Sequence, residues 1–187
     1  MTAVPRPAGA LLLPGAGYTP ARPLLHYARA VLEQHGFTVR ELWWETPGTF
    51  VRFSDAERTA WVERQVVAAL AAADDCRLIV GKSLGTLAAG IAADRALPAV
   101  WLTPLLRTGA VAGALRRTPA RTLLVGGTAD PLWDSAVAGE LPHETLEFPG
   151  ADHGLELPGD VVGSAALLQT YVRAFDRFAG GLARPRA

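Results

Sequence analysis

The chain has 187 residues, of which 50% are hydrophobic and 19% are charged, and its formal net charge is +0. A chain of this length can bury one substantial core, and its hydrophobic fraction is too high for an intrinsically disordered protein. The balanced charge argues against a nucleic-acid or anionic-membrane partner, because either partner favours a clustered basic excess. A single cysteine cannot form an internal disulfide, and four scattered histidines do not supply a zinc site. We therefore expect one domain over residues 1–187.

No segment approaches the roughly 20 apolar residues that a membrane span requires. The apolar run of residues 8–13 is too short for the core of a signal peptide, and Pro14-Gly15 ends it. We therefore expect a soluble, cytoplasmic protein with no membrane partner.

Short apolar runs alternate with amphipathic segments along the chain. Runs that are apolar on both faces suit buried strands of a parallel sheet, and they cover residues 9–14, 38–44, 77–80, 99–102, 122–126 and 145–148. Helical spacing of apolar residues predicts helices over residues 22–35, 54–73, 84–95 and 160–178, with shorter helical pieces before Arg117 and after Trp133. Residues 45–53 contain Pro47 and Gly48 and are expected to form a loop. This alternation predicts a three-layer α/β/α sandwich around a mainly parallel six-stranded sheet.

The third predicted strand is followed by the pentapeptide Gly81-Lys82-Ser83-Leu84-Gly85. Ligands of parallel sheets lie beyond the carboxyl ends of the strands, so this is a candidate position for chemistry. A G-x-S-x-G pattern suits a nucleophile on a sharp strand-to-helix turn, because the strained backbone is tolerated only where close neighbours lack side chains. A Gly-rich phosphate-binding turn or a plain tight turn is the alternative interpretation.

A serine nucleophile needs a base, and the base needs an acid to orient it. Asp130 follows the fifth predicted strand and His153 follows the sixth, so both are expected at the same edge of the sheet as Ser83. Asp134 is the reserve candidate for the acid, and Asp152 is expected to fix the loop of its neighbour His153. Taken singly, Asp130 and His153 are equally compatible with ordinary loop positions.

Three segments together resemble the α/β-hydrolase superfamily. Gly81-Lys82-Ser83-Leu84-Gly85 resembles its nucleophile elbow, Gly127-Thr128-Ala129-Asp130 its acid loop, and Gly150-Ala151-Asp152-His153-Gly154 its histidine loop. The opening Leu13-Pro14-Gly15-Ala16-Gly17 resembles the loop that supplies part of the oxyanion hole. The resemblance covers residues 11–178. The chain is similar to a minimal member of the superfamily without a large lid, such as the small dienelactone-hydrolase-like proteins. Dienelactone hydrolases use a cysteine nucleophile, whereas this chain has Ser83, so that specific activity does not carry over.

The resemblance implies Ser83 as nucleophile, His153 as general base and then acid, and Asp130 as the orienting acid. It also implies an oxyanion hole formed by the N–H groups of Leu84 and of Ala16 or a neighbour, and it implies no metal and no organic cofactor. We expect hydrolysis of a small or medium carboxylic ester or thioester through an acyl-enzyme. The expected partner is a small-molecule substrate, and the sequence leaves the oligomeric state open.

Residues near the carboxyl ends of the strands are the candidates for substrate binding. They are Gly15, Gly17, Tyr18, Trp44, Leu105 and Trp133. Core packing is the alternative for each aromatic residue, and Trp133 is the aromatic that we expect to form a pocket wall. Lys82 is compatible with steering anionic substrates or supporting the oxyanion, but we expect its side chain to point away from the catalytic face.

Three other functions remain compatible with the sequence. A serine peptidase or an acyltransferase would use the same triad. A non-catalytic binding protein would keep the fold without needing all three catalytic residue types. A flavodoxin-like nucleotide or flavin binder would share the parallel sheet but would have no use for Asp130 and His153.

Overall fold

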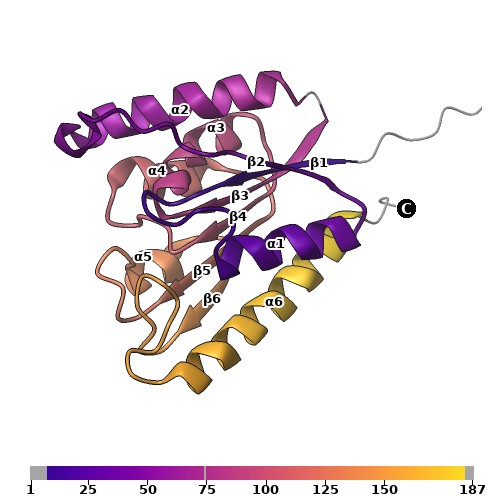
Figure 1. The fold of residues 1–187 in the computed structure, drawn as a ribbon, viewed down its shortest axis with the longest axis vertical. Helices are drawn as coiled ribbons and strands as arrows, with labels where there is room; N and C mark the ends of the chain where they lie inside the picture. Colours follow the sequence, from indigo (N-terminus) through magenta and orange to yellow (C-terminus); the bar gives the residue numbers. More distant parts are fainter. Residues whose placement is uncertain (1–7, 74, 184–187) are drawn as a thin grey trace, which may run out of the picture.

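The computed structural model describes residues 8–73 and 75–183, and within them six strands form one parallel sheet (Figure 1). The strands are β1 (Gly9–Leu13), β2 (Thr38–Glu41), β3 (Cys76–Lys82), β4 (Ala99–Leu102), β5 (Thr122–Gly127) and β6 (Glu144–Phe148). β1, β4 and β5 are buried along their whole length, as expected for strands that are covered on both faces. The predicted six-stranded sheet is therefore confirmed. The two ends of the predicted domain, residues 1–7 and 184–187, lie outside the described residues.

Helices cover both faces of the sheet, which confirms the predicted three-layer sandwich (Figure 1). On one face lie α1 (Pro23–Gln34) and α6 (Val161–Ala183). On the other lie α2 (Asp55–Ala71), α3 (Ala89–Asp94), α4 (Gly109–Arg117) and α5 (Ser135–Glu140). Successive strand side chains point to opposite faces, so Leu11 and Leu13 pack under α2 while Leu12 packs under α1. Between β4 and β5 the chain forms only α4 and its short connections, so no large lid is inserted there.

The strand order β2-β1-β3-β4-β5-β6 places the candidate residues at one position of the sheet. The chain runs outward from β1 to β2 and then returns past β1 to β3, so the direction of winding reverses between β1 and β3. At their carboxyl ends Leu13 pairs with Gly81, and the connections that follow these two strands leave toward opposite faces. Ligand sites of open parallel sheets lie at such a reversal.

Several element boundaries differ from the predictions. β2 ends at Glu41, so Trp44 lies beyond the strand instead of inside it. The helix predicted from residue 84 begins as a 3₁₀ helix, η2 (Ser83–Ala88), before it continues as α3. The predicted loop of residues 45–53 contains a short 3₁₀ helix, η1 (Phe50–Arg52).

The start of α2 and the hydropathy of the helices agree with the sequence. The Ser54 hydroxyl accepts a hydrogen bond from the N–H of Glu57, and the Glu57 carboxylate accepts one from the N–H of Ser54, which forms a capping box at the predicted start of the helix. Within residues 8–73 and 75–183, no helix has both the length and the apolar composition that crossing a membrane requires.

Gly85 allows the start of η2 to lie in contact with the end of β1 and the turn that follows it. Its N–H donates to the carbonyl of Pro14 at 3.1 Å. A Cβ atom at Gly85 would lie 2.6 Å from the carbonyl oxygen of Leu13 and 2.7 Å from its Cβ. Both obstructing atoms belong to a buried strand, so neither can move aside cheaply.

We expect Gly85→Ala to destabilise the fold by about 1–3 kcal/mol, because the added methyl overpacks the contact between β1 and η2. The control is Gly113→Ala in α4, where the nearest atom to an added Cβ is the flexible end of Arg117 at 3.8 Å. We expect this control to gain about 0.5–1 kcal/mol, since alanine is the better helix former. Urea unfolding of both variants measures the two changes, and equal stabilities would contradict the close contact.

Candidate active site

Ser83 lies directly after β3, at the point where the chain turns into η2. Its φ of 51° is in the left-handed region, which a non-glycine residue adopts only when the surrounding structure holds it there. Gly81 permits the turn from one side, because a Cβ atom there would lie 2.5 Å from the ring of Trp101. On the other side, Thr86 donates from its hydroxyl to the carbonyl of Ser83 at 2.6 Å. The same hydroxyl accepts the N–H of Leu105 at 3.3 Å, which ties the turn to the segment after β4.

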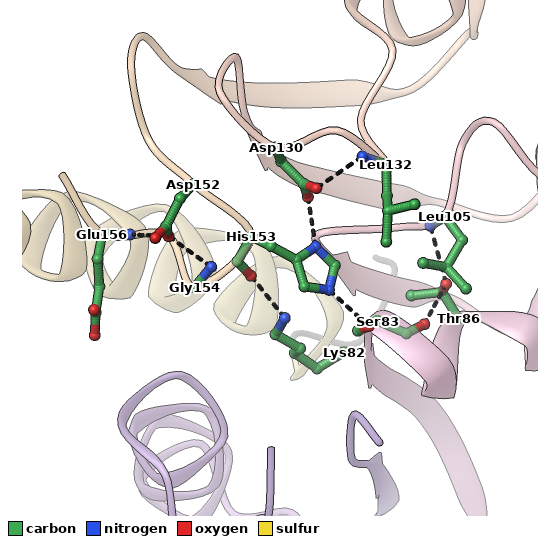
Figure 2. A network of polar contacts seen from close by, with 10 residues as sticks. All are labelled: Lys82, Ser83, Thr86, Leu105, Asp130, Leu132, Asp152, His153, Gly154 and Glu156. Atoms are coloured by element: carbon green, nitrogen blue, oxygen red, sulfur yellow. Dashed lines mark hydrogen bonds and ion pairs between the residues drawn. The ribbon is translucent and has the colours of Figure 1, made fainter. Parts of the chain in front are cut away.

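His153 lies between Ser83 and Asp130 (Figure 2). Its Nε2 is 2.8 Å from the hydroxyl oxygen of Ser83, and its Nδ1 is 2.7 Å from Oδ2 of Asp130. The three side chains come from the carboxyl ends of β3, β5 and β6, where the sequence predicts them. They form a continuous series of hydrogen bonds from a hydroxyl through an imidazole to a carboxylate.

The structure distinguishes the two candidate acids. Asp130 contacts His153, whereas Asp134 caps α5 and accepts hydrogen bonds from the N–H groups of Ala136 and Val137, each at 3.1 Å. Asp152 accepts the N–H of Gly154 at 2.7 Å and so stabilises the loop that carries His153, as its position predicts.

Burial differs along the series. The Asp130 side chain has 0% exposure, while that of His153 has 34%. A buried carboxylate needs hydrogen-bond donors, and besides His153 the N–H of Leu132 supplies one to Oδ1 at 2.9 Å. Within the described ranges, no three His, Cys, Asp or Glu side chains gather in an arrangement suited to a metal ion.

The loops after β5 and β6 are joined through their backbones. The N–H of Ala129 donates to the carbonyl of Ala151 at 3.0 Å, and the N–H of Thr128 donates to that of Phe148, also at 3.0 Å. The hydroxyl of Thr128 in turn accepts the N–H of Gly150 at 2.8 Å. These bonds fix the separation between the segment that carries Asp130 and the segment that carries His153.

The turn after β1 is fixed from two directions at Pro14. Its carbonyl accepts the N–H of Gly85 at 3.1 Å and the indole N–H of Trp44 at 2.9 Å. The turn then closes through the N–H of Gly15, which donates to the carbonyl of Tyr18 at 3.0 Å. This arrangement brings Ala16 and Gly17 to the same cavity wall as Ser83.

A cavity of about 780 Å³ opens in front of Ser83. Of the predicted site residues, it is lined by Ala16, Gly17, Ser83, Leu84 and Leu105. Its remaining lining was not predicted and consists of Thr46, Pro47, Gly48, Phe50, Val51, Asp55, Arg58, Leu87 and Thr108. Most of these belong to the segment between β2 and the first turns of α2. That segment follows the carboxyl end of a strand, so the rule that located the candidate triad would also have pointed to it.

Four predicted substrate-binding residues do not line this cavity. Trp133 is 2% exposed, its ring lies against Gly126, and its Nε1 donates to Glu147 at 2.6 Å, so it belongs to the core instead of a pocket wall. Trp44 packs on Trp61, and its indole N–H donates to the carbonyl of Pro14, so it holds the turn after β1 without lining the cavity. The two others, Gly15 and Tyr18, belong to the turn after β1 and close it through their backbone hydrogen bond.

Lys82 is buried inside the site, at 2% exposure, and is neither at the surface nor pointing away from the candidate residues. Its ammonium donates to the main-chain carbonyl of His153 at 2.7 Å (Figure 2). It also lies 5.1 Å from the ring centroid of Tyr18. Burial lowers the pKa of Lys82 from 10.5 to about 8, against the opposing attraction of Asp130 and Asp152. The sequence near Lys82 could not predict its burial, because the groups around it come from distant parts of the chain.

Comparison with known proteins identifies structural neighbours only. No protein-family model and no curated protein sequence matches the chain. A dienelactone hydrolase from Anabaena variabilis superimposes with a TM-score of 0.65 at 21% identity, over 91% of this chain and 86% of that one. Est1E from Butyrivibrio proteoclasticus with bound ferulic acid gives 0.66 at 15% identity, over 91% and 87%. A monoacylglycerol lipase from Paleococcus ferrophilus gives 0.67 at 15% identity, over 90% and 94%. At these identities the likeness establishes a common fold.

The burial of Lys82 predicts its titration. Lys82 is the only lysine of the chain, so lysine-selective isotope labelling gives a single side-chain NMR signal. We expect this signal to titrate with a midpoint near the lowered pKa of about 8. A midpoint at the ordinary value of 10.5 would show an ammonium in contact with water and would contradict the buried placement.

The same titration predicts a change in stability. The pKa of Lys82 is about 8 in the folded chain and near 10.5 when unfolded, so between these values the unfolded chain binds more protons. The free energy of unfolding of the wild type, compared with that of Lys82→Met, should therefore rise by roughly 3 kcal/mol as the pH increases through this window. Each pKa unit of difference between the folded and unfolded chain contributes about 1.36 kcal/mol. Urea unfolding of both proteins at the two ends of the window measures the difference.

Proposed function

We propose that this chain, which has the α/β-hydrolase fold, is a serine hydrolase that cleaves a small or medium carboxylic ester or thioester through an acyl-enzyme. The observation that carries the proposal is the hydrogen-bonded series from Ser83 through His153 to Asp130, at 2.8 and 2.7 Å. Ser83 also has the strained backbone that exposes a nucleophile at the end of a strand. A binding protein has no physical need for all three groups in this arrangement.

In the proposed first step, the hydroxyl oxygen of Ser83 attacks the acyl carbon of the substrate and its proton passes to Nε2 of His153. Asp130 accepts a hydrogen bond from the Nδ1–H of His153, which holds the imidazole in the tautomer that can act as a base and stabilises the imidazolium that forms. His153 then protonates the leaving alcohol or thiol as the bond from the acyl carbon breaks. A water molecule then attacks the acyl carbon of the acyl-enzyme while His153 takes its proton. His153 returns this proton to the oxygen of Ser83 as the carboxylic acid is released.

The carbonyl oxygen becomes negatively charged in the tetrahedral intermediate and needs fixed donors. The N–H of Leu84, in the first turn of η2, has no carbonyl one turn earlier in the same helix to bind. Leu84 and Ala16 both line the cavity beside Ser83, so we assign the oxyanion hole to their N–H groups. Losing one such donor costs about 2.7–4 kcal/mol of the activation barrier.

The composition of the cavity wall supports the proposed substrate class. The cavity wall includes several large apolar side chains: Phe50, Val51, Leu84, Leu87 and Leu105. Such a wall favours an apolar acyl or alcohol group, and about 780 Å³ is within the usual range for a small-molecule site. Among the described residues of the wall, the charged side chains are Asp55 and Arg58, which lie 3.4 Å apart and so pair with each other.

The first test of the function is labelling with a fluorophosphonate followed by mass mapping. We expect the wild type to be modified at Ser83, and we expect Ser83→Ala and His153→Ala to remain unlabelled. Asp130→Asn should lower kcat/KM for an ester by roughly 10³–10⁴-fold, because the imidazole would be held in the wrong tautomer. Asp134→Asn is the matched control: asparagine caps a helix as well as aspartate does, so activity should stay near the wild-type value.

Two outcomes would contradict this triad. One is the absence of labelling in a folded wild type. The other is equal losses of activity in Asp130→Asn and Asp134→Asn. Product analysis with an added alcohol or amine acceptor separates hydrolysis from acyl transfer.

The cavity predicts how the preferred substrate length can be changed. Leu105→Trp should fill part of the space beside Ser83 and shift the preference toward shorter acyl chains in a series of p-nitrophenyl esters. The loss for long esters should reach roughly 10–100-fold in kcat/KM, with acetate esters little affected. Val67→Trp, on the exposed side of α2, is the control and should leave the length profile unchanged. Equal losses for short and long esters in Leu105→Trp would show that this cavity is not the acyl site.

A further inference from the structure

Lys82 joins three segments that are far apart in the sequence. It is the last residue of β3, its Cδ lies 3.4 Å from where a side chain on Gly15 would begin, and its ammonium reaches the carbonyl of His153. Its aliphatic part therefore runs beneath the turn after β1, and its charged end contacts the loop after β6 (Figure 2). A lysine ordinarily lies at the surface, and a buried ammonium loses its hydration. The burial of Lys82 therefore needs an explanation.

A contribution of Lys82 to the stability of the fold does not explain its burial. Within the described part of the chain, no carboxylate lies within salt-bridge distance of Lys82. Asp130 and Asp152 attract its charge from farther away, and its ammonium contacts one carbonyl and the face of one aromatic ring. Burying a charge on such partners is unfavourable compared with an apolar side chain of similar size. A group that costs stability and contacts the backbone of the candidate base is better explained by what it does for that base.

The contacted atom makes this explanation specific. The carbonyl that accepts the hydrogen bond belongs to His153 itself, so the bond restrains the main chain from which the imidazole extends. The loop after β6 is fastened to the loop after β5 at Ala151, but those bonds do not connect it to β3. Lys82 connects the backbone of the base to the strand that ends at the nucleophile, Ser83.

We propose that Lys82 is a positioning residue: its ammonium holds the main chain of His153 at the end of β3, so that the imidazole stays within hydrogen-bond distance of both Ser83 and Asp130. The inference rests on the proposed function, because the position of the base matters for the rate only if the triad reacts. An imidazole displaced by about 1 Å can lose roughly 100-fold in rate. An ammonium suits the role better than a neutral donor, because charged hydrogen bonds are shorter and stronger.

The charge of Lys82 makes this positioning sensitive to pH. The titratable and charged groups that act on its surroundings are Tyr18 with Arg22, Glu156 and Tyr171, together with Asp130, Asp152 and His153. Burial raises the pKa of Tyr18, so its ring stays neutral beside the ammonium near neutral pH. Lys82 is charged below a pH of about 8 and neutral above it, so the contact with His153 should weaken as the pH rises through this value.

The test compares the full-length wild type with Lys82→Met and Lys82→Arg in ester hydrolysis from about pH 6 to about pH 9.5. At neutral pH we expect Lys82→Met to lose roughly 10–100-fold in kcat with KM changed less than about twofold, since the substrate cavity is untouched. Lys82→Arg should recover most of this loss, and its activity should persist at higher pH because its guanidinium stays charged. The wild type should decline above pH 8, whereas Lys82→Met should show no such decline.

Thr122→Val is the matched control for removing a buried donor. The hydroxyl of Thr122 donates to the carbonyl of Ala120 at 3.1 Å, at the opposite end of β5 from the candidate site. Its kcat should equal that of the wild type. Lys82→Met with wild-type kcat would overturn the proposal. If Lys82→Met does not fold, an alkaline decline shared by the wild type and Lys82→Arg would overturn it instead.

A second readout separates this inference from the proposed function. If the folded wild type neither hydrolyses esters nor reacts with the fluorophosphonate, the proposed function is wrong, and NMR of ¹⁵N-histidine-labelled protein then tests the positioning contact. The Nδ1 proton of His153, bonded to Asp130, should be observable in the wild type and in Lys82→Arg and lost to solvent exchange in Lys82→Met. An unchanged resonance in Lys82→Met would overturn the positioning role.

Discussion

The backbone of the turn after β1 lies directly against the backbone of the turn at Ser83, and the rest of the candidate site depends on this contact. Gly85 donates to Pro14, and any side chain at Gly85 would meet the carbonyl of Leu13. β1 and β3 are neighbours that pair at Leu13 and Gly81, and the chain turns out of β3 two residues later, where Ser83 has a positive φ. The same contact brings Ala16 to the cavity wall beside Ser83. A single close approach of two backbones thus sets the positions of both the hydroxyl and the proposed oxyanion donors.

The remaining candidate groups are positioned by contacts between loops. Backbone hydrogen bonds join the loops that carry Asp130 and His153, and Lys82 joins the second of these loops to β3. Two buried charges therefore lie close to one imidazole: the carboxylate of Asp130, which contacts its ring, and the ammonium of Lys82, which contacts its main chain. Groups that are already fixed before a substrate binds need little rearrangement when charge develops during a reaction. The desolvation of Lys82 is the energetic cost of this arrangement.

The cavity is built from different parts of the chain than the candidate triad. Its outer wall comes from the segment between β2 and α2, and this segment is supported by the packing of Phe50 and Trp44 on Trp61. Trp44 connects the two regions, because its ring packs in this aromatic cluster while its N–H binds Pro14 of the first turn. In such an arrangement the outer wall can vary while Ser83, His153 and Asp130 keep their geometry.

The sequence by itself determined the sheet, the layers and the three candidate residues, because buried strands have continuous apolar runs and the strand ends follow from where those runs stop. It left open whether Asp130 or Asp134 meets His153, and it misplaced the side chains of Lys82 and Trp133. Only the tertiary structure decided these, together with the cavity wall of residues 46–58. The physical reason is that the direction and partner of a side chain depend on segments that are distant along the chain. Lys82 is buried by a turn and a loop that begin 65 or more residues away from it, and no pattern near Lys82 encodes their approach.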